Sequence, residues 1–346
     1  MKTIVPKFMV AVVLILILAV LSLPSPSAAA ETVRMYSCLV RSVQDSITTH
    51  LEQRLGMTLP TLTFSCGEQW ARIQAETRGG KNPQGIQADL IFNIMPDQMA
   101  MGKAQGLWMK YPNSPVWKGI DPYYMDPDGQ GYNLGTFAWL LMGNKNLLKE
   151  KGYELPRRVH DLLDPKWKGQ IVLPSPLTSG TAYMINISFL SMFGEEEGWK
   201  FLERFDKNVA QYTRSGSAPA LMVGRGEYVI AMGSDEGIPE LIQKGMPLVY
   251  RVLDEGLGVA GNWLAIPKGS KNVPAAQKVI DYVGSEEFQK FFSGFGYLVA
   301  RPGIPNPLYP TKPKFMAIKW DFYGEEANRT RVLNTWKEKF GLKMQR

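Results

Sequence analysis

Small hydroxyl and glycine residues at the start of a predicted helix are the clearest candidates for binding chemistry in this chain. A continuous apolar run ends in a Pro-Ser-Pro turn, the residues Thr178, Ser179, Gly180 and Thr181 follow, and an apolar helical pattern begins directly after them. A buried strand that leads into a helix in this way leaves free backbone N–H groups at the helix start. Together with the positive end of the helix dipole, these groups predict a binding seat for an anion. The alternative is that Ser179 or Thr181 only caps the helix.

Two later turns carry similar residues. One turn, in the sequence Tyr-Thr-Arg-Ser-Gly-Ser, contains Ser215 and Ser217 and precedes a helical stretch. The other follows a short predicted strand and contains Ser234, Asp235 and Glu236 before the next helix. The two acidic residues either complement the dipole of that helix or bind ammonium or hydroxyl groups of a ligand. An acidic residue beside an anion seat would suit a zwitterion or a hydroxylated anion.

The elements that must position these turns follow an α/β pattern. In the first part of the chain strands and helices alternate, and each strand ends in small or polar residues at the start of a helix. Ligands bind outside the carboxyl ends of the strands in open α/β sheets. The candidates in this part are therefore Ser37, Ser65 with the adjacent Cys66, and Asn93, and an ordinary helix cap is the alternative for each. The strands are predicted over 32–36, 59–64 and 88–92 and the helices over 43–55 and 68–78.

The middle and the end of the chain continue this pattern. A long connection over 111–133, rich in Pro, Gly, Tyr and Asp, precedes a strand over 136–142 that leads into a second lobe. A strand over 262–267 returns from that lobe. The last predicted element is a long helical region over 315–340, whose apolar residues suggest docking on the first lobe. The other predicted elements are helices over 147–151, 238–244, 274–283 and 285–292 and strands over 171–173, 228–232 and 248–253.

Length, composition and charge describe an ordinary soluble protein with two lobes. The chain has 346 residues, more than one hydrophobic core usually covers, and it is 45% hydrophobic and 21% charged. Its formal net charge is +7, with the basic residues scattered rather than grouped. Because a basic stripe and a known motif are both missing, nucleic-acid binding is not expected. A mild positive field favours small anions instead.

The N-terminus predicts export. Lys2 and Lys7 precede the uncharged apolar run Phe8–Leu23, two prolines follow, and three alanines offer a small-x-small cleavage site. That arrangement indicates a secretory signal peptide, cleaved after Ala30, and a mature protein in the periplasm. The alternative is an uncleaved anchor, for which the apolar run is short. Removal of the signal takes away two lysines and leaves a net charge of about +5.

Cysteine, histidine and glycine patterns argue against an enzyme. The sequence leaves open whether Cys38 and Cys66 form a disulfide or remain thiols. Only two histidines are present, His50 and His160, so neither a His-rich metal site nor a Ser or Cys nucleophile with a His partner is expected. Gly256–Gly261 matches G-x-G-x-x-G, but a predicted strand follows it where a dinucleotide site needs a helix. We therefore expect a hinge loop there and no cofactor.

Three motifs together resemble a known family. They are D-P-K-W-K-G at Asp164–Gly169, S-G-T at Ser179–Thr181 and S-G-S-A-P-A at Ser215–Ala220. Their order along the chain resembles that of the periplasmic solute-binding proteins of ABC importers, type 2 fold, in the ferric-iron, phosphonate and sugar-phosphate branch. The resemblance implies two α/β lobes, joined by two crossover segments, that close over a ligand in the cleft. It also implies delivery of the ligand to an ABC permease in the inner membrane.

The resemblance further implies where the ligand contacts lie. Ser37, Ser65 and the Ser179–Thr181 turn match contact positions of the family, and the Ser215–Ser217 turn is a further match. Ferric-binding members usually carry adjacent tyrosines after the strand that here ends at Gly233, and this chain has no such pair there. Members with Ser-rich helix starts bind phosphonates or organophosphates.

These observations predict an α/β, two-lobe protein of the periplasmic-binding type that is not an enzyme. The first lobe comprises 31–140 and 262–346 and the second 141–261, with hinge-like closure near 137–143 and 261–265. We expect a monomer that binds a small anionic solute, with a phosphonate or organophosphate favoured, in the cleft between the lobes. The alternatives are a receptor for ferric iron or another metal, an exported enzyme, and a partner of a chemoreceptor.

Overall fold

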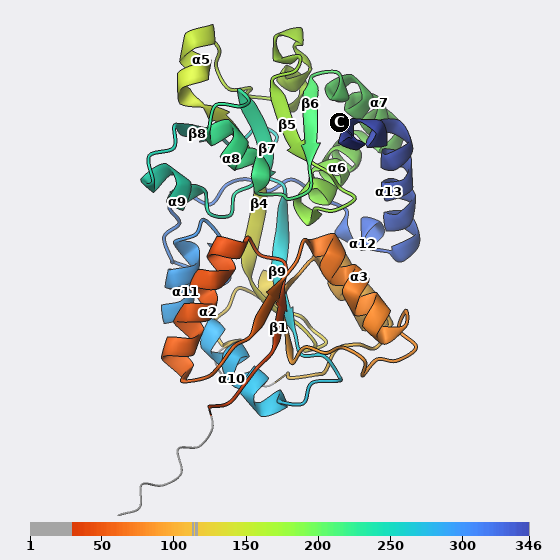
Figure 1. The fold of residues 1–346 in the computed structure, drawn as a ribbon, viewed down its shortest axis with the longest axis vertical. Helices are drawn as coiled ribbons and strands as arrows, with labels where there is room; N and C mark the ends of the chain where they lie inside the picture. The colour runs from red at the N-terminus through yellow and green to blue at the C-terminus, as the bar shows by residue number, and fades with distance from the viewer. Residues whose placement is uncertain (1–29, 113, 115–116, 346) are drawn as a thin grey trace, which may run out of the picture. The chain divides into compact units, whose positions relative to one another are not determined.

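Ten strands, in the part of the chain that the structure describes, form one sheet (Figure 1). This computed structural model describes residues 30–112, 114 and 117–345, and the chain from Thr32 onward forms one compact unit. The strand order is β2-β1-β3-β9-β4-β7-β5-β6, and β8 and β10 both pair with β4. The strands are β1 Met35–Ser37, β2 Thr61–Thr63, β3 Leu90–Ile94, β4 Tyr132–Asn144, β5 Ile171–Pro174, β6 Val209–Thr213, β7 Ile230–Ser234, β8 Leu248–Arg251, β9 Val259–Ala265 and β10 Leu298–Val299.

The long strand β4 divides the sheet into two groups. Its first half, from Tyr132 to Ala138, pairs with β9, and its second half, from Trp139 to Asn144, pairs with β7 and β8. We call β1, β2, β3, β9 and β10 the first group and β5, β6, β7 and β8 the second group. Within each group the central strands are parallel, with β1 between β2 and β3, and β5 between β6 and β7. Burial on both faces explains the continuous apolar runs of β3, β5 and β7.

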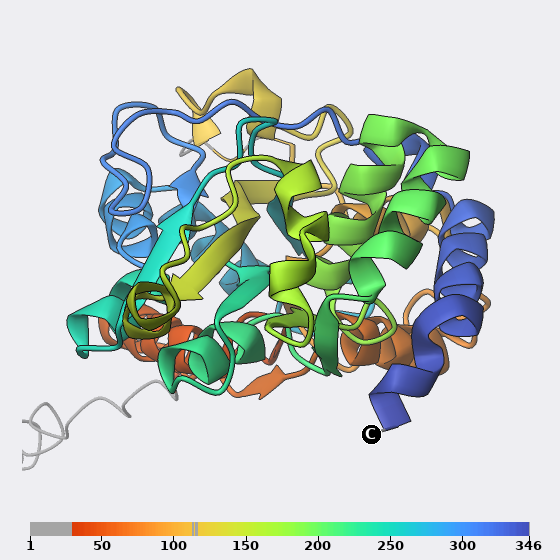
Figure 2. The same ribbon diagram turned by 90° about the horizontal axis from the view of Figure 1, so that it is seen from above.

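Helices flank both groups (Figures 1 and 2). Figure 1 shows α2, α3, α10 and α11 beside the first group and α5, α6, α7 and α8 beside the second. The helices are α2 Arg41–Leu55, α3 Cys66–Thr77, α4 Pro96–Ala104, α5 Lys145–Lys151, α6 Gly180–Phe193, α7 Glu195–Asp206, α8 Ala218–Gly224, α9 Ile238–Gln243, α10 Val273–Val283, α11 Glu286–Ser293, α12 Trp320–Tyr323 and α13 Glu326–Phe340. Short 3-10 helices cover Pro122–Tyr124, Val159–Leu163, Pro165–Trp167 and Gly341–Gln345.

Most predicted elements are confirmed because their signals are local. The helix α2 ends at Gly56, whose φ of 64° suits the left-handed cap position. Two helices, α4 and α7, lie outside the predicted elements. In α4 the buried residues include Asp97 and Gln98, and these polar residues hide its apolar face in the sequence. In α7 three glutamates open a helix whose buried Phe201 and Phe205 carry a helical spacing that could have revealed it.

The C-terminal region differs from its prediction in two ways. It forms two helices rather than one, and residues 315–319 are not helical. The helix α13 also packs on the second group, where Trp336 lies edge-on to Tyr212 of β6 with the ring centroids 5.0 Å apart, and Arg331 pairs with Glu195 of α7. Figures 1 and 2 show α13 (blue) alongside α7 (green). The predicted docking on the first lobe holds for α12, which contacts α4, but is wrong for most of α13, because an apolar stripe shows that a helix docks without showing on which surface.

The glycine-rich segment before β9 is not a loop throughout. The strand β9 begins at Val259, three residues before the predicted start at Asn262, and so a strand rather than a helix follows the first two glycines, as the absence of a dinucleotide site requires. A Cβ at Gly258 would lie 2.0 Å from Nε1 of Trp139, and a Cβ at Gly261 would lie 2.5 Å from Nε1 of Trp263. Close packing of the backbone against two tryptophans therefore explains these glycines, rather than the hinge freedom that we expected.

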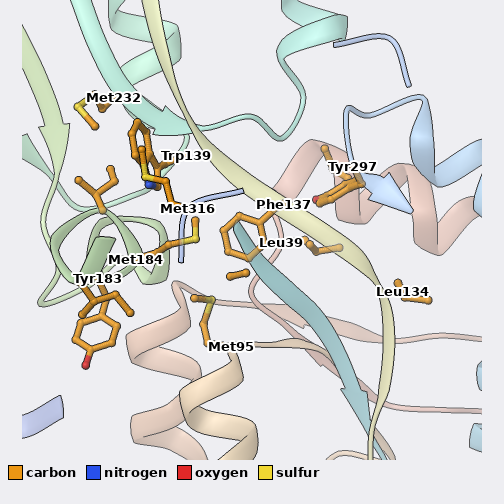
Figure 3. Packing of buried hydrophobic residues seen from close by; sticks show 14 of the residues in the cluster. Leu39, Met95, Leu134, Phe137, Trp139, Tyr183, Met184, Met232, Tyr297 and Met316 are labelled. Atoms are coloured by element: carbon orange, nitrogen blue, oxygen red, sulfur yellow. The ribbon is translucent and has the colours of Figure 1, made fainter. Parts of the chain in front are cut away.

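A buried cluster crosses both groups and reaches the start of α6. It contains Leu39 and Met95 from the first part of the chain and Phe137 and Trp139 from the middle of β4 (Figure 3). Met95 also lies against α6, because a Cβ at Gly180 would be 2.7 Å from its Sδ atom. The core thus packs directly beneath the predicted anion seat.

The predicted signal peptide lies almost wholly in residues 1–29, outside the described residues. Within the described part of the chain, no helix has both the length and the apolar character needed to span a membrane.

Candidate functional site

A cavity of about 400 Å³ lies between the two groups, at the carboxyl ends of their parallel strands. The predicted residues that line it are Ser65, Cys66, Asn93, Ser179, Gly180, Thr181, Ser215, Ser217, Ser234 and Glu236. Ser37 and Asp235 are the two predicted residues outside this lining. Turns that lie far apart in the sequence therefore meet at one place, as expected for the ends of strands in an open α/β sheet.

The Ser179–Thr181 turn forms the start of α6. The hydroxyl oxygen of Ser179 accepts a hydrogen bond from the N–H of Ala182 at 3.3 Å, so Ser179 is the helix cap. Gly216 lies directly against this turn, since a Cβ there would be 2.6 Å from Oγ1 of Thr181 and 2.9 Å from Oγ of Ser179. Two hydroxyl protons and the helix N-terminus therefore lie on one wall of the cavity, which suits an anion.

The first turn of α2 is a second donor site, which the sequence analysis missed. Its cap residue, Val40, makes no side-chain hydrogen bond to the helix, so the N–H groups of Arg41 and Ser42 lack helix partners. Arg41 and Ser42 both line the cavity. The Arg41 side chain is exposed and forms no ion pair with a described carboxylate. Because the apolar helical spacing in the sequence starts only at Val43, the predicted helix began there and did not include Arg41 and Ser42.

A second arginine lies at the rim and bridges the two groups. Nη2 of Arg214 lies 3.0 Å from Oε1 of Glu68 in α3, and the side chains are 77% and 51% exposed. The Thr178 hydroxyl donates to the Arg214 carbonyl at 2.7 Å, and the hydroxyl oxygens of Ser215 and Ser217 are 3.0 Å apart. Because an ion pair this exposed contributes little to stability, Arg214 is available to a ligand at small cost.

A disulfide and a capping box fix the start of α3. Cys38 and Cys66 form a disulfide with Cα atoms 4.9 Å apart, so neither is a free thiol and Cys66 meets the cavity only as part of the disulfide. The Ser65 hydroxyl donates to Oε2 of Glu68 at 2.8 Å and accepts the Glu68 N–H at 3.3 Å. These hydrogen bonds lower the pKa of Glu68. The single hydroxyl proton of Ser65 is therefore donated to Glu68 and is not available for a hydrogen bond to a ligand.

Replacing Ser65 by alanine is expected to lower the free energy of unfolding by about 1 kcal/mol, because the capping box is lost. We expect the affinity for an anion to change less than about threefold, since the Ser65 hydroxyl already donates its proton to Glu68. Urea unfolding and calorimetric titration measure the two effects. Ser285, which caps α11 through the N–H of Phe288, provides the control cap away from the cavity. A much larger loss of affinity in Ser65→Ala than in Ser285→Ala would show a direct ligand contact.

Asn93 lines the cavity in a rare backbone conformation. Its φ of 72° lies in the left-handed region, which asparagine adopts more readily than most residues. Its carbonyl oxygen accepts a hydrogen bond from Nε2 of Gln69 at 3.0 Å. Its side-chain Oδ1 is buried without a hydrogen-bond partner among the described residues. Unusual backbone and an unpaired polar atom beside a cavity are typical of a ligand-binding position.

Two predicted residues lie behind the cavity wall. The Ser37 hydroxyl oxygen is fully buried and accepts the N–H of Leu39 at 3.2 Å. Asp235 accepts the N–H of Ala138 through Oδ1 at 2.9 Å and the hydroxyl of Tyr309 through Oδ2 at 2.8 Å. Both side chains therefore satisfy groups of the protein, and the structure does not bring them to the cavity.

Glu236 is the acidic residue of this turn that faces the cavity. Its Oε2 accepts the N–H of Val40 at 3.4 Å, which joins the end of β7 to the start of α2. Burial, with the neighbouring Asp235 carboxyl as a further cause, raises the pKa of Glu236 to about 8. Burial likewise raises the pKa of Asp235 to about 7. A largely protonated Glu236 at neutral pH adds a hydrogen-bond donor to the cavity and does not repel an anion.

The raised pKa of Glu236 makes stability depend on pH. Between about pH 5 and pH 8 the unfolded carboxyl is ionised while the folded one holds its proton, so the free energy of unfolding falls as the pH rises, by up to ~1.4 kcal/mol per pH unit. Glu236→Gln is expected to flatten this slope. Urea unfolding at several pH values measures it, with the exposed Glu338→Gln as the control. An unchanged slope in Glu236→Gln would contradict the assignment.

Both histidines pack against aromatic side chains, and in the part of the chain that the structure describes metal-binding groups do not gather. Nε2 of His50 lies 2.9 Å from the hydroxyl of Tyr282, and its ring stacks on Phe291 with centroids 4.1 Å apart. Burial lowers the pKa of His50. His160 packs edge-on against Phe193. Among the described residues, no three or more His, Cys, Asp or Glu side chains lie close enough together to hold a metal ion.

Comparison with known proteins agrees with this fold. Residues 88–325 match the family model of bacterial extracellular solute-binding proteins. A probable ABC transporter periplasmic-binding protein, y4fP of Sinorhizobium fredii, is 25% identical over 310 residues, which cover 84% of this chain and 80% of that protein.

Solved structures of two further proteins resemble this chain. The periplasmic binding protein AfuA of Actinobacillus pleuropneumoniae, with fructose-6-phosphate bound, matches with a TM-score of 0.81 and 26% identity over 91% of this chain and 100% of that one. The apo ferric ion-binding protein A of Pasteurella haemolytica matches with a TM-score of 0.73 and 18% identity over 90% and 98%. The second likeness shows the fold alone.

The family match runs from just before β3 to the end of α12, and so includes the cavity walls formed by β3, α6 and β7. It spans more than half of the chain, and the two solved structures cover about nine-tenths of the chain. The chain therefore belongs to the bacterial extracellular solute-binding proteins, with the type 2 periplasmic-binding-protein fold.

Proposed function

We propose that this protein is the substrate-binding component of an ABC uptake transporter and that it binds a small anionic solute, favouring a phosphonate or organophosphate. One observation carries the proposal: the N-termini of α2 and α6 meet at the same cavity as Arg41 and Arg214. N–H groups at helix starts and guanidinium groups are the donors that phosphate oxygens prefer. A volume of about 400 Å³ lies within the range of small-molecule sites.

The donor groups divide between the two ends of the ligand in this proposal. The turn Ser179, Gly180 and Thr181, with Arg41, binds the anionic head. Hydroxyl groups elsewhere on the ligand pair with the unpartnered Oδ1 of Asn93 and with Glu236. The remaining proposed contacts are Ser215, Ser217 and Ser234, with the backbone of Ser65 and Cys66 at the rim. The fructose-6-phosphate bound to AfuA is an anion with hydroxyl groups of this kind.

Transport requires that the protein is exported and that it closes. We propose export after cleavage behind Ala30, a periplasmic monomer, and docking on an ABC permease in the inner membrane. The two lobes, 31–140 with 262–346 and 141–261, would close by bending of β4 and β9, which cross between them. The helix α13 lies within 262–346 by sequence, but it packs on β6 and α7 of the second group, so we propose that the boundary of the first lobe falls before α13.

Ferric iron is the nearest competing ligand, and the cavity chemistry disfavours it. The described lining contains no tyrosine and only two carboxyl groups, Glu68 and Glu236. Glu68 is engaged by Ser65 and Arg214, and the pKa of Glu236 is raised. Hard cations such as ferric iron are bound by anionic oxygen ligands, which this lining does not gather.

A ligand screen on the purified mature protein tests the proposal. We expect fructose 6-phosphate or 2-aminoethylphosphonate to raise the free energy of unfolding, by about 2.7 kcal/mol at a hundredfold excess over the dissociation constant. Fructose is the neutral control and ferric citrate the metal control, and mass spectrometry identifies any solute that co-purifies. Stabilisation by fructose or ferric citrate, but by neither phosphorus compound, would contradict the proposal. A visible charge-transfer band with iron would favour the metal alternative.

A further inference from the structure

A buried ion pair connects two helices that belong to different groups of the sheet. Nε of Arg329 in α13 lies 2.5 Å from Oδ2 of Asp97 in the first turn of α4, and the side chains are 17% and 2% exposed. The other carboxyl oxygen of Asp97 is buried without a hydrogen-bond partner among the described residues. Arg329 is therefore the cation that compensates the negative charge of the buried Asp97 carboxylate.

The helix α13 is fixed to the second group along its length. Arg331 forms a two-pronged ion pair with Glu195 of α7, and Lys339 pairs with Glu203 of the same helix. Trp336, which is 1% exposed, packs against β6. Arg329 thus extends from a helix that is attached to the second group.

The helix α4 belongs instead to the first group. It follows β3 directly, after Asn93 of the cavity wall, and it packs against β9. The contact with α13 is close at this point, since a Cβ at Gly324, before the start of α13, would lie 3.4 Å from Cα of Asp97. Separation of the two groups at the cavity would therefore pull Asp97 away from Arg329.

The ion pair is also connected to the anion seat. The guanidinium of Arg329 lies over the ring of Tyr183, 5.3 Å from its centroid, and the Tyr183 hydroxyl donates to the carbonyl of Tyr323 at 2.6 Å. Tyr183 lies in the first turn of α6, three residues after Gly180. A cation over an aromatic ring and a short hydrogen bond hold this turn in place.

We propose that Asp97 and Arg329 are positioning residues that hold the two groups of the sheet together through α4 and α13 and orient the start of α6 toward the ligand. Their contribution should appear in ligand release, because breaking a buried, hydrogen-bonded charge pair changes dissociation more than association. The pair Arg331–Glu195 has the same chemistry, but both partners are on the second group and they are 43% and 35% exposed. It provides the matched control.

Two measurements on the mature protein test this role. Arg329→Ala is expected to raise the dissociation rate of fructose 6-phosphate at least tenfold, with a smaller change in its association rate, and to increase the radius of gyration of the ligand-free protein in small-angle X-ray scattering. Arg331→Ala is expected to change neither quantity. Arg329→Lys, which keeps the charge, should lie between Arg329→Ala and the wild type, and the exchange Asp97→Arg with Arg329→Asp should restore slow release.

The two measurements separate this inference from the proposed function. The release measurement rests on the proposed function, because it needs a bound ligand, and the scattering measurement does not. If the wild-type protein does not bind fructose 6-phosphate, the ligand proposal fails for this compound while scattering still tests the ion pair. Equal effects of Arg329→Ala and Arg331→Ala would overturn the inference, and so would a scattering curve and release rate that match the wild type. If Arg329→Ala does not unfold cooperatively in urea, the lysine variant and the charge exchange decide the question.

Discussion

Joint replacement of Ser179 and Thr181 by alanine is expected to weaken the binding of a phosphate monoester by about 30- to 1,000-fold, or roughly 2–4 kcal/mol. Both hydroxyl groups lie at the start of α6 and line the cavity. Each would donate one hydrogen bond to a charged oxygen, and such bonds contribute about 1.5–3 kcal/mol each. The expected loss is smaller than the sum of two such bonds because water in the variant can replace part of each one. The backbone N–H groups remain in the variant, so some affinity should persist.

Isothermal titration with fructose 6-phosphate measures this loss. The control replaces Ser46 and Thr330, two exposed hydroxyl residues on α2 and α13 that are not part of the cavity lining. Gly216→Ala tests the same seat by filling it, because its Cβ would lie 2.6 Å from Oγ1 of Thr181. Wild-type affinity in the double variant would rule out the start of α6 as the anion seat.

Loss of the Cys38–Cys66 disulfide is expected to lower the free energy of unfolding by about 3–4 kcal/mol. The two cysteines are 28 positions apart, and closing a loop of this size restricts the unfolded chain by about that amount. The disulfide also joins the end of β1 to the first residue of α3, at the edge of the cavity. Stability and the shape of the rim therefore depend on the same bond.

Urea unfolding with and without dithiothreitol measures the effect of the disulfide. The variant with Cys38→Ala and Cys66→Ala is expected to have the stability of the reduced protein and to be insensitive to dithiothreitol. Titration of thiols confirms that reduction has occurred. A reduced protein with two free thiols and an unchanged unfolding midpoint would contradict the prediction.

The sequence alone predicts the parts of the site that depend on neighbouring residues. Hydroxyl and glycine residues between an apolar run and a helical pattern placed the seat at Ser179–Thr181, and the same reasoning found Ser65 and Asn93. The signals are local because caps and turns are decided within a few residues. Because ligands bind at the carboxyl ends of parallel strands in such sheets, these turns were then expected to meet at one place.

Only the tertiary structure decided how these parts combine. It pairs Cys38 with Cys66, adds Arg41 to the cavity, and separates Glu236, which faces the cavity, from Asp235, which binds Ala138 and Tyr309. It also seats α13 on the second group rather than the first.

These features depend on which surfaces meet across long stretches of chain. A hydrophobic stripe or a charged side chain specifies that a partner is needed, without specifying which one. Neighbouring carboxyl groups such as Asp235 and Glu236 look alike in the sequence, and their separate roles arise only when distant donors pack against one of them. The sequence by itself thus determined most elements, their caps and the turns that we propose bind an anion, and long-range packing determined the cavity that unites them.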